Sequence, residues 1–467
     1  MDEGSEASPA TPLLDILQSL TQDTEILAAV QTALTSAPRV DVATRDARRA
    51  TVTCTLGELL ARPSSSARAA VLATAISRVA DAGVEVAIPH SGAFVSLFYA
   101  LQAFGEDPPV AVAVCRAVFV LCRGSDNRDA ALSSGILPLL LAFFSVPETT
   151  HPLDVLTAAC DALANLLAHP AAQKTAASCG ALTHVVSALR RHASDPPMAE
   201  AACSAILNIA DCDELRSTVA GAGAIPAIVE ALSLHPTSPG VAEAAWGALM
   251  NLADEPSLRT QIIGAGALPL LIAALSAPSP SSCSPPPALA SLCSLVESLA
   301  VSPAHRASCV TAGAMATLAA VLQSFKQDLG AARAVVGAIA ALSDNGRGNG
   351  APPENGCIGG LVDAAILHAA ADVGLVARAA EAGWFLFRHL PNAVASSQHF
   401  PALVGLLRGP VSSDARATLA LCNMLTNAAV RNPDNKRALA DQGAAPVALS
   451  VLAVRLGRRA WAWSPYP

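Results

Sequence analysis

The stretch MAEAACSAILNIADCDELRSTVAGAGAIPAIVEALSLHPTSPGVAEAAWGALMNLAD, Met198–Asp254, states one pattern twice. One landmark recurs within it and a second recurs just beyond its end, each at an interval of 43 residues. They are the Asn-(Ile/Leu)-Ala-Asp stretches that begin at Asn208 and Asn251, and the Gly-Ala-(Ile/Leu)-Pro stretches that begin at Gly223 and Gly266. A fixed period of this length is typical of a solenoid in which helical repeats stack on one another.

The composition favours helices that pack closely. Hydrophobic residues make up 52% of the 467 residues, but aromatic residues only 3%. The apolar mass is therefore alanine, leucine and valine, which suits helix–helix packing better than a β-sheet. Charged residues are only 14%, as expected when helices are buried on two or three sides, and the net charge of −8 argues against a general nucleic-acid binder.

A glycine marks each repeat, just before a helix that often carries proline in its first turn. The marked positions are Gly92, Gly135, Gly180, Gly223, Gly266, Gly313, Gly356 and Gly443, with His399 in the same phase. We expect each glycine to end one helix in a left-handed turn. In the repeat of Gly223, three helices are predicted: Arg216–Ala222, Ile225–Leu234 and Val241–Ala253.

The third helix of each repeat carries the strongest periodicity. Relative to Asn165, Asn208 and Asn251, apolar residues recur five and two positions before and one position after the asparagine, which is one helical stripe. The positions five before are Cys115, Cys160, Cys203, Trp246 and Cys293. We expect this stripe to be core, with free thiols in a reducing compartment.

The domain organisation follows from the repeats. Residues 1–46 are predicted to be a tail with a capping helix at Leu13–Leu34, residues 47–456 the solenoid, and residues 457–467 a C-terminal tail. Proline- and glycine-rich insertions at 278–287 and 344–360 are predicted to be surface loops. The first residues are acidic and polar and lack the apolar run of a signal peptide, and no apolar run approaches the length of a membrane span.

These motifs resemble the armadillo repeat family, whose repeat has about 40 residues in three helices. The corner stands here as Gly135-Ile136-Leu137-Pro138, Gly223-Ala224-Ile225-Pro226 and Gly266-Ala267-Leu268-Pro269, and the end of the third helix as Ala162–Leu167, Ala205–Ala210 and Ala248–Ala253. A weaker copy surrounds Asn427. The resemblance implies an all-α, armadillo-type right-handed superhelix of about eight to nine three-helix repeats.

Within that family, the segment Asn432–Arg437 and the 43-residue spacing look like the armadillo region of leucine-rich-repeat kinases, or like small stand-alone armadillo proteins. No kinase, GTPase or U-box segment accompanies the repeats. The array also ends without a third helix after Ala445–Leu456. A fragment of a larger multidomain kinase is therefore one alternative interpretation.

The resemblance implies that the third helices line a concave groove, where asparagine side chains bind the amides of an extended peptide. A carboxamide offers a donor and an acceptor, and so matches a peptide unit. The alternative is that each asparagine braces neighbouring backbone. The groove candidates are Asn165, Asn208, Asn251, Asn427, Asp161, Ser204, Glu200, Glu243, Asp211 and Asp254. The acidic residues favour a basic partner segment, or are ordinary solvated charges; Asp211 and Asp254 could instead begin helices.

Several functions are disfavoured. Nuclear-import carriers of this family place tryptophan four residues before the asparagine, whereas this chain has Asp161, Ser204 and Gly247 there, and Trp246 falls on the core stripe. Histidines and cysteines show no metal-ligand spacing, and no phosphate loop or catalytic constellation is found. We therefore expect no enzyme activity, no cofactor, no metal site, no nucleic-acid partner and no membrane span.

The function predicted from the sequence is a non-enzymatic scaffold, cytoplasmic or alternatively nuclear, that binds a protein segment along its concave face. A rival hypothesis is a regulator of a small GTPase, or a chaperone-like adaptor, that acts through an end or a convex surface. The rival rests on the proline/serine- and glycine/asparagine-rich loops.

Overall fold

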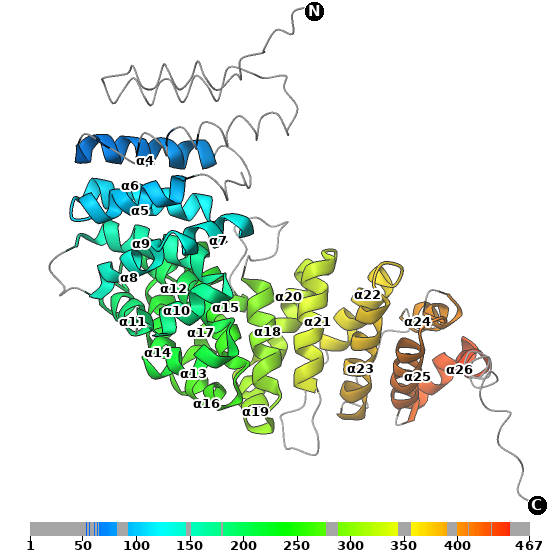
Figure 1. The fold of residues 1–467 in the computed structure, drawn as a ribbon. Coiled ribbons are helices and arrows are strands. Elements are labelled where there is room, and N and C mark those ends of the chain that lie inside the picture. Colours follow the sequence, from blue (N-terminus) through cyan, green and yellow to red (C-terminus); the bar gives the residue numbers. More distant parts are fainter. Residues whose placement is uncertain are drawn as a thin grey trace, which may run out of the picture. The chain divides into compact units, whose positions relative to one another are not determined.

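The computed structural model describes residues 53, 56, 60, 63, 65–81, 92–145, 151–178, 181–276, 288–343, 356–389, 399–409, 411–430 and 432–448. Its regular structure is α-helical, as predicted, and it divides into two compact bodies, Met1–Leu252 and Ala253–Pro467. Each body is described by itself (Figure 1). The predicted domain boundaries at 46 and 456 fall outside the described residues and stay predictions.

In the N-terminal body, the first, second and third helices of successive repeats form three layers. Its first helices are α7 (Ser125–Ser133), α10 (Pro170–Ser178) and α13 (Asp213–Gly221). Its second helices are α5 (Ala93–Phe104), α8 (Ile136–Ser145), α11 (Ala181–Arg191) and α14 (Ala224–Leu234). Its third helices are α4 (Ser66–Asp81), α6 (Pro108–Leu121), α9 (Leu153–Leu167), α12 (Pro196–Ala210) and α15 (Pro239–Ala253), which ends at the boundary between the bodies. Second helices pack on second helices, and third helices on third helices, along the stack (Figure 1).

The C-terminal body repeats the arrangement. Its first helices are α16 (Pro256–Gly264), α19 (Pro303–Thr311) and α26 (Pro433–Asp441). Its second helices are α17 (Ala267–Ser276), α20 (Ala314–Phe325), α22 (Gly356–His368) and α24 (His399–Arg408). Its third helices are α18 (Leu289–Ala300), α21 (Leu329–Ser343), α23 (Val373–His389) and α25 (Ala415–Val430), and each packs on the next.

Five of the marked glycines adopt the predicted left-handed backbone. The φ angles are 78° at Gly135, 89° at Gly223, 88° at Gly266, 91° at Gly313 and 65° at Gly443. At three of these corners the chain changes direction between the first and the second helix. The bend is 74° between α13 and α14, 79° between α16 and α17, and 68° between α19 and α20. The glycine therefore permits a sharp corner that a residue with a Cβ would adopt only with strain.

The prediction was wrong at two marked glycines. Gly92 has φ −65°, although it precedes α5 just as the left-handed Gly223 precedes α14. Gly356 is helical and starts α22, so the predicted loop 344–360 ends before it, and residues 344–355 lie outside the described residues. Burial of Cys357, Ile358 and Leu361 outweighs the low helix propensity of the glycines there. Gly180, the loop 278–287 and residues 457–467 also lie outside the described residues.

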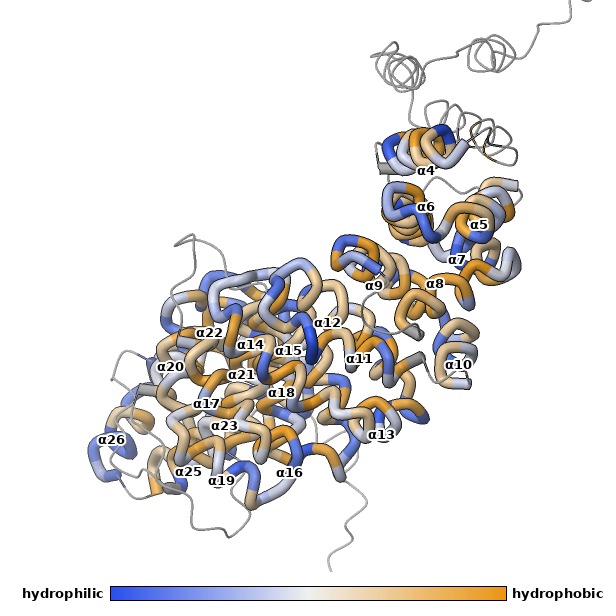
Figure 2. Tube along the Cα trace, turned by 90° about the vertical axis from the view of Figure 1, so that its left-hand side faces the viewer, coloured by the Kyte–Doolittle hydropathy of each residue, from blue (hydrophilic) through white to orange (hydrophobic). Residues whose placement is uncertain are grey.

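The predicted core stripe of the third helices is confirmed. Cys115, Cys160, Cys203 and Cys293 are 0% exposed, and Trp246 is 1% exposed. The positions two before and one after each asparagine are also buried: Leu163, Ile206, Leu249, Leu166, Ile209 and Leu252. Figure 2 shows hydrophobic residues distributed along nearly every helix, as expected when each helix packs on several neighbours.

We predict that the glycine corner is required for its conformation and not for space. A Cβ at Gly223 or at Gly221 would meet nothing within 4 Å, but only Gly223 has positive φ. Gly223→Ala should therefore lower the free energy of unfolding by about 1–2 kcal/mol. Gly221→Ala, at the end of helix α13, should be neutral or slightly stabilising. Urea denaturation followed by circular dichroism measures both, and equal effects of the two variants would contradict the assignment.

We also predict that the buried thiols are chemically silent in the folded protein. Burial raises the pKa of Cys203 to about 12 and that of Cys122 to about 12, so almost no thiolate forms near neutral pH. Cys212 and Cys422 are both half-buried, but burial raises the pKa of Cys422, so Cys212 is expected to react first among the described cysteines. Timed alkylation at pH 8 followed by peptide mass spectrometry should label Cys212 in minutes and Cys203 only after denaturation. Rapid labelling of Cys203 in the folded protein would refute this.

Candidate protein-binding face

The four predicted asparagines brace adjacent third helices. Each Nδ2 donates a hydrogen bond to a backbone carbonyl of the preceding third helix, one residue before the equivalent position. The bonds are Asn165 to Phe119 O (2.6 Å), Asn208 to Ala164 O (2.7 Å), Asn251 to Leu207 O (3.0 Å) and, in the C-terminal body, Asn427 to Trp384 O (3.0 Å). A carbonyl that already accepts within its helix has a second lone pair for this bond. The bracing interpretation is thus realised at all four positions.

The same side chains keep hydrogen-bonding capacity on their outer side. All four asparagines are half-buried, and no described residue donates a hydrogen bond to their Oδ1 atoms. One N–H of each carboxamide is used in the brace, so a second N–H and the Oδ1 acceptor stay available. Bracing and peptide binding therefore do not exclude one another at these residues.

The other candidates of the N-terminal body follow the asparagines along one helical stripe. On α12, Glu200 and Ser204 lie eight and four residues before Asn208, and Asp211, which follows the helix, lies three after it; these spacings fall on a single face. Glu200 and Asp211 are exposed, and Ser204 is half-buried. We call this surface the third-helix face, made of Asp161, Asn165, Glu200, Ser204, Asn208, Asp211, Glu243 and Asn251. Asp254 and Asn427 belong to the C-terminal body and are not part of it.

The alternative that Asp211 and Asp254 begin helices is wrong. Helix α13 begins after Cys212, and Asp211 instead follows the last residue of α12. Helix α16 is capped by Glu255, whose carboxylate accepts from the Ser257 N–H at 3.4 Å. In both cases the helix is capped one residue later than expected, at Cys212 before α13 and at Glu255 before α16.

Two carboxylates of the third-helix face interact directly. Burial, together with the nearby Glu200 carboxylate, raises the pKa of Asp161 to about 6, and Arg116 partly offsets both effects. Asp161 lies four residues before Asn165, and Glu200 lies on the next third helix. The face therefore holds a carboxyl group whose ionised form is less favourable than that of an ordinary aspartate, and a nearby cation would stabilise it.

The acidic groups of the face lack ion-pair partners among the described residues. Glu200, Glu243 and Asp211 form no salt bridge there, whereas in the C-terminal body Glu381 on α23 and Asp372, directly before α23, are paired. In that body Arg416 binds Glu381 through two bonds of 2.8 and 2.9 Å, and Arg333 binds Asp372 at 2.7 Å. Negative charge is thus available to a partner on the N-terminal third-helix face and internally neutralised on the C-terminal one.

Sequence reasoning missed a set of arginines that cap the third helices. An arginine seven residues before a marked glycine donates from Nε to the carbonyl at the end of the third helix six residues earlier. The bonds are Arg128 to Cys122 O (2.8 Å), Arg216 to Ala210 O (2.8 Å), Arg259 to Ala253 O (2.7 Å) and Arg306 to Ala300 O (2.8 Å). They satisfy free carbonyls and place positive charge at the negative end of the helix. The sequence signal that could have revealed these arginines is their fixed position seven residues before the glycine.

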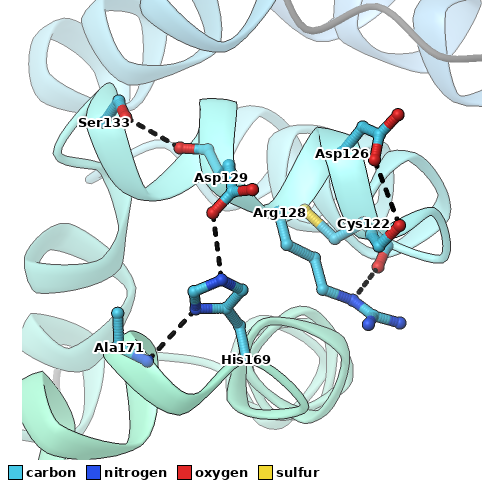
Figure 3. Close-up of polar contacts among 8 residues, drawn as sticks. Cys122, Asp126, Arg128, Asp129, Ser133, His169 and Ala171 are labelled. Atoms are coloured by element: carbon cyan, nitrogen blue, oxygen red, sulfur yellow. Dashed lines mark hydrogen bonds and ion pairs between the residues drawn. The ribbon is translucent and has the colours of Figure 1, made fainter.

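A histidine–aspartate pair beside the first of these caps is structural. Figure 3 shows the imidazole of His169 between the Asp129 carboxylate and the backbone of Ala171. The His169 Nε2 lies 2.9 Å from Asp129 Oδ1, and the Ala171 N–H donates to Nδ1 at 3.1 Å. Both ring nitrogens are therefore occupied, and the pair links helix α7 to the start of α10 instead of offering a free base.

Within the part of the chain that the structure describes, no group of three or more histidine, cysteine, aspartate or glutamate side chains is placed to hold a metal ion. In the same residues no single helix combines the length and apolarity that crossing a membrane requires. Three bent pairs of consecutive helices meet both requirements when each pair is counted as one segment.

Comparison with known proteins supports the fold. A crystal structure of an engineered protein from the Northeast Structural Genomics Consortium is similar over 97% of this chain and 96% of its own, with a TM-score of 0.63 and 21% sequence identity. A designed armadillo repeat protein matches 53% of this chain and 99% of its own, with a TM-score of 0.45 and 20% identity. No protein-family model and no curated protein sequence matches the chain.

The three-helix repeats with left-handed glycine corners thus define an all-α, armadillo-type repeat fold. The similarity to solved structures concerns the fold alone. The suggested likeness to the repeats of leucine-rich-repeat kinases or to small stand-alone armadillo proteins stays a prediction.

We predict that Asp161 makes stability depend on pH. Its pKa of about 6 in the folded protein exceeds the usual value of 3.8, so the folded state binds more protons between these values. Stability should therefore fall as pH rises from 4 to 6. Asp161→Asn should remove this contribution and gain about 1–3 kcal/mol over the wild type above pH 6.5. Urea midpoints measured from pH 4 to 7.5 test it.

The matched control is Glu230→Gln, which removes an exposed carboxylate on α14, and its urea midpoints are measured at the same pH values. Glu200→Gln should shift the Asp161 contribution to lower pH, because it removes one of the two causes of the raised pKa. A constant difference between Asp161→Asn and the wild type at every pH would contradict the assignment.

Proposed function

We propose that this protein is a non-enzymatic scaffold whose third-helix face binds an extended, basic segment of a partner protein. The observation that carries the proposal is the combination of outward hydrogen-bonding capacity at Asn165, Asn208 and Asn251 with unpaired carboxylates beside them. The asparagines lie on three successive third helices, so their spacing follows the stack. An armadillo-type fold is compatible with this role but does not by itself establish it.

In this proposal, hydrogen bonds from the three asparagines set the register of the bound segment. A peptide unit presents one donor and one acceptor, and each free side of a carboxamide can meet one of them. One such bond contributes about 0.5–1.5 kcal/mol, so three in a row are needed for useful affinity. The bracing bonds hold the carboxamides in place before a partner arrives, which reduces the entropy that binding has to offset.

In this proposal, the carboxylates of the face select a partner segment that is basic. A lysine or arginine near Asp161 and Glu200 would relieve the repulsion between the two carboxylates and favour the ionised form of Asp161. Glu243 and Asp211 extend the negative charge along the same stripe. Complementary charge of this kind raises association rates and selects against acidic segments.

The proposal is tested by blocking the face without removing its braces. Ser204→Arg places a long cation on the half-buried stripe and leaves Asn165, Asn208 and Asn251 intact. Full-length wild type and variants are used for affinity capture with mass spectrometry from the source cells, and each recovered partner is then re-bound in purified form. Ser204→Arg should weaken such a partner at least tenfold, while Ser233→Arg, at an exposed site on α14, should not.

Charge and hydrogen bonding are then separated. Glu200→Lys should weaken binding, and added salt should narrow its difference from the wild type, whereas Glu214→Lys on α13 should have no effect. The triple variant Asn165→Ala, Asn208→Ala, Asn251→Ala should also lose affinity. Because it loses three braces as well, this loss supports the proposal only if circular dichroism shows that the variant stays folded. Partners that bind Ser204→Arg as tightly as the wild type would rule out the third-helix face as their site.

The rival hypothesis, a small-GTPase regulator or chaperone-like adaptor acting through an end or convex surface, stays open. It predicts that deleting residues 278–287 removes partners, whereas the third-helix proposal predicts little change. The same capture experiment therefore discriminates the two.

A further inference from the structure

A second surface, on the layer of second helices, carries exposed apolar residues that the fold does not use. On α5, Val95 is 45% exposed and Tyr99 is 53% exposed. These residues are four apart, so they lie on one side of the helix, and Gln102, Ala103 and Glu106 continue that side. Single exposed apolar residues are ordinary, but a pair in line on one helix is a contiguous patch.

A hollow lies at the C-terminal end of this patch, between α5 and α8. Its volume is about 580 Å³, within the range of sites that hold small ligands or inserted side chains. Apolar side chains of Leu101, Leu139 and Phe143 line it, and polar side chains of Gln102, Glu106 and His151 complete its wall. The ring of His151 packs edge-on against Phe143 with the ring centroids 5.0 Å apart.

The charge at the hollow has one sign. Helices α5 and α8 contain no lysine or arginine, and the turn after α5 carries Glu106 and Asp107. Neither carboxylate forms an ion pair or a side-chain hydrogen bond with a described residue; Asp107 precedes α6 without bonding to its first turn. An apolar hollow is thus bordered by negative charge that nothing in the described part of the chain neutralises.

We propose that this surface, which we call the α5–α8 hollow, docks a protein segment that carries a large apolar side chain with lysine or arginine next to it. The large side chain enters between Leu101, Leu139 and Phe143, and the cation meets Glu106 at the rim. Val95 and Tyr99 contact the rest of the segment along α5. Large apolar anchors and arginine are the groups that most often dominate protein interfaces. The hollow lies on second helices, so this proposal does not depend on the third-helix face.

The test is selection from a phage-displayed library of random twelve-residue peptides on the full-length wild-type chain. Selected peptides are synthesised with a fluorophore, and their dissociation constants are measured by fluorescence anisotropy. Ala142→Trp fills the hollow from an exposed position on α8, and Glu106→Lys reverses the charge at its rim. We expect peptides that combine a large apolar residue with an adjacent lysine or arginine and that lose at least tenfold affinity in each variant.

Two matched controls come from the repeats themselves. Ala273 is exposed and lies seven residues after Gly266 on α17, as Ala142 does after Gly135 on α8. Ala273→Trp and Glu230→Lys should leave the dissociation constants within twofold of the wild type. Circular dichroism melts of all four variants show whether any loss of binding reflects unfolding, and Glu106→Lys tests the proposal even if Ala142→Trp does not fold.

Three outcomes would overturn the proposal. The first is that no selected peptide distinguishes Glu106→Lys or a folded Ala142→Trp from the wild type. The second is that peptides without a basic residue bind as tightly and are insensitive to Glu106→Lys. The third is that the selected peptides lose binding to Ser204→Arg instead, which would place them on the third-helix face and support the proposed function while removing this one.

Discussion

The packing of each third helix on the next is the interaction on which the rest of each body depends. An apolar stripe of small and medium side chains, among them Cys160, Cys203 and Trp246, is buried completely between neighbouring helices. Because a repeat contacts mainly its neighbours, this stripe must recur in every repeat for the stack to continue. The asparagine braces then fix how far one third helix is shifted along the next, because a side chain bound to a particular carbonyl permits one register only.

The same packing constraint also explains which positions of a third helix can carry polar side chains. Burial on the inner side of a third helix uses the positions five and two before and one after the asparagine. On α12 the position four before Asn208 is half-buried and the position eight before it is exposed, as is Asp211 three after it, whereas Gly247, four before Asn251, is buried. In the C-terminal body, charges on neighbouring third helices pair with one another, such as Arg416 with Glu381. In the N-terminal body Glu200 and Glu243 form no ion pair with a described residue, so the same scaffold presents a charged surface.

The two proposed surfaces differ in how they arise. On the third-helix face, groups that stabilise the stack have remaining hydrogen-bonding capacity, so structure and recognition share the same side chains. At the α5–α8 hollow, Val95 and Tyr99 contribute little to the core. Their exposure lowers solubility, and packing within the fold gives no reason for it. Substitutions at the first surface therefore alter stability and binding together, whereas substitutions at the second separate them.

The sequence by itself determined the repeat, the all-helical class, the core stripe and most glycine corners, because a strict period ties each of them to a position that local chemistry can satisfy in only one way. It misplaced Gly92, which has negative φ, and Gly356, which is helical, and it left open whether Asn165, Asn208 and Asn251 brace the stack. The arginine caps escaped notice although their spacing is regular. Only the tertiary structure decided these points, since a hydrogen bond across about 44 residues of sequence, or a carboxylate left without a partner, depends on which helices become neighbours.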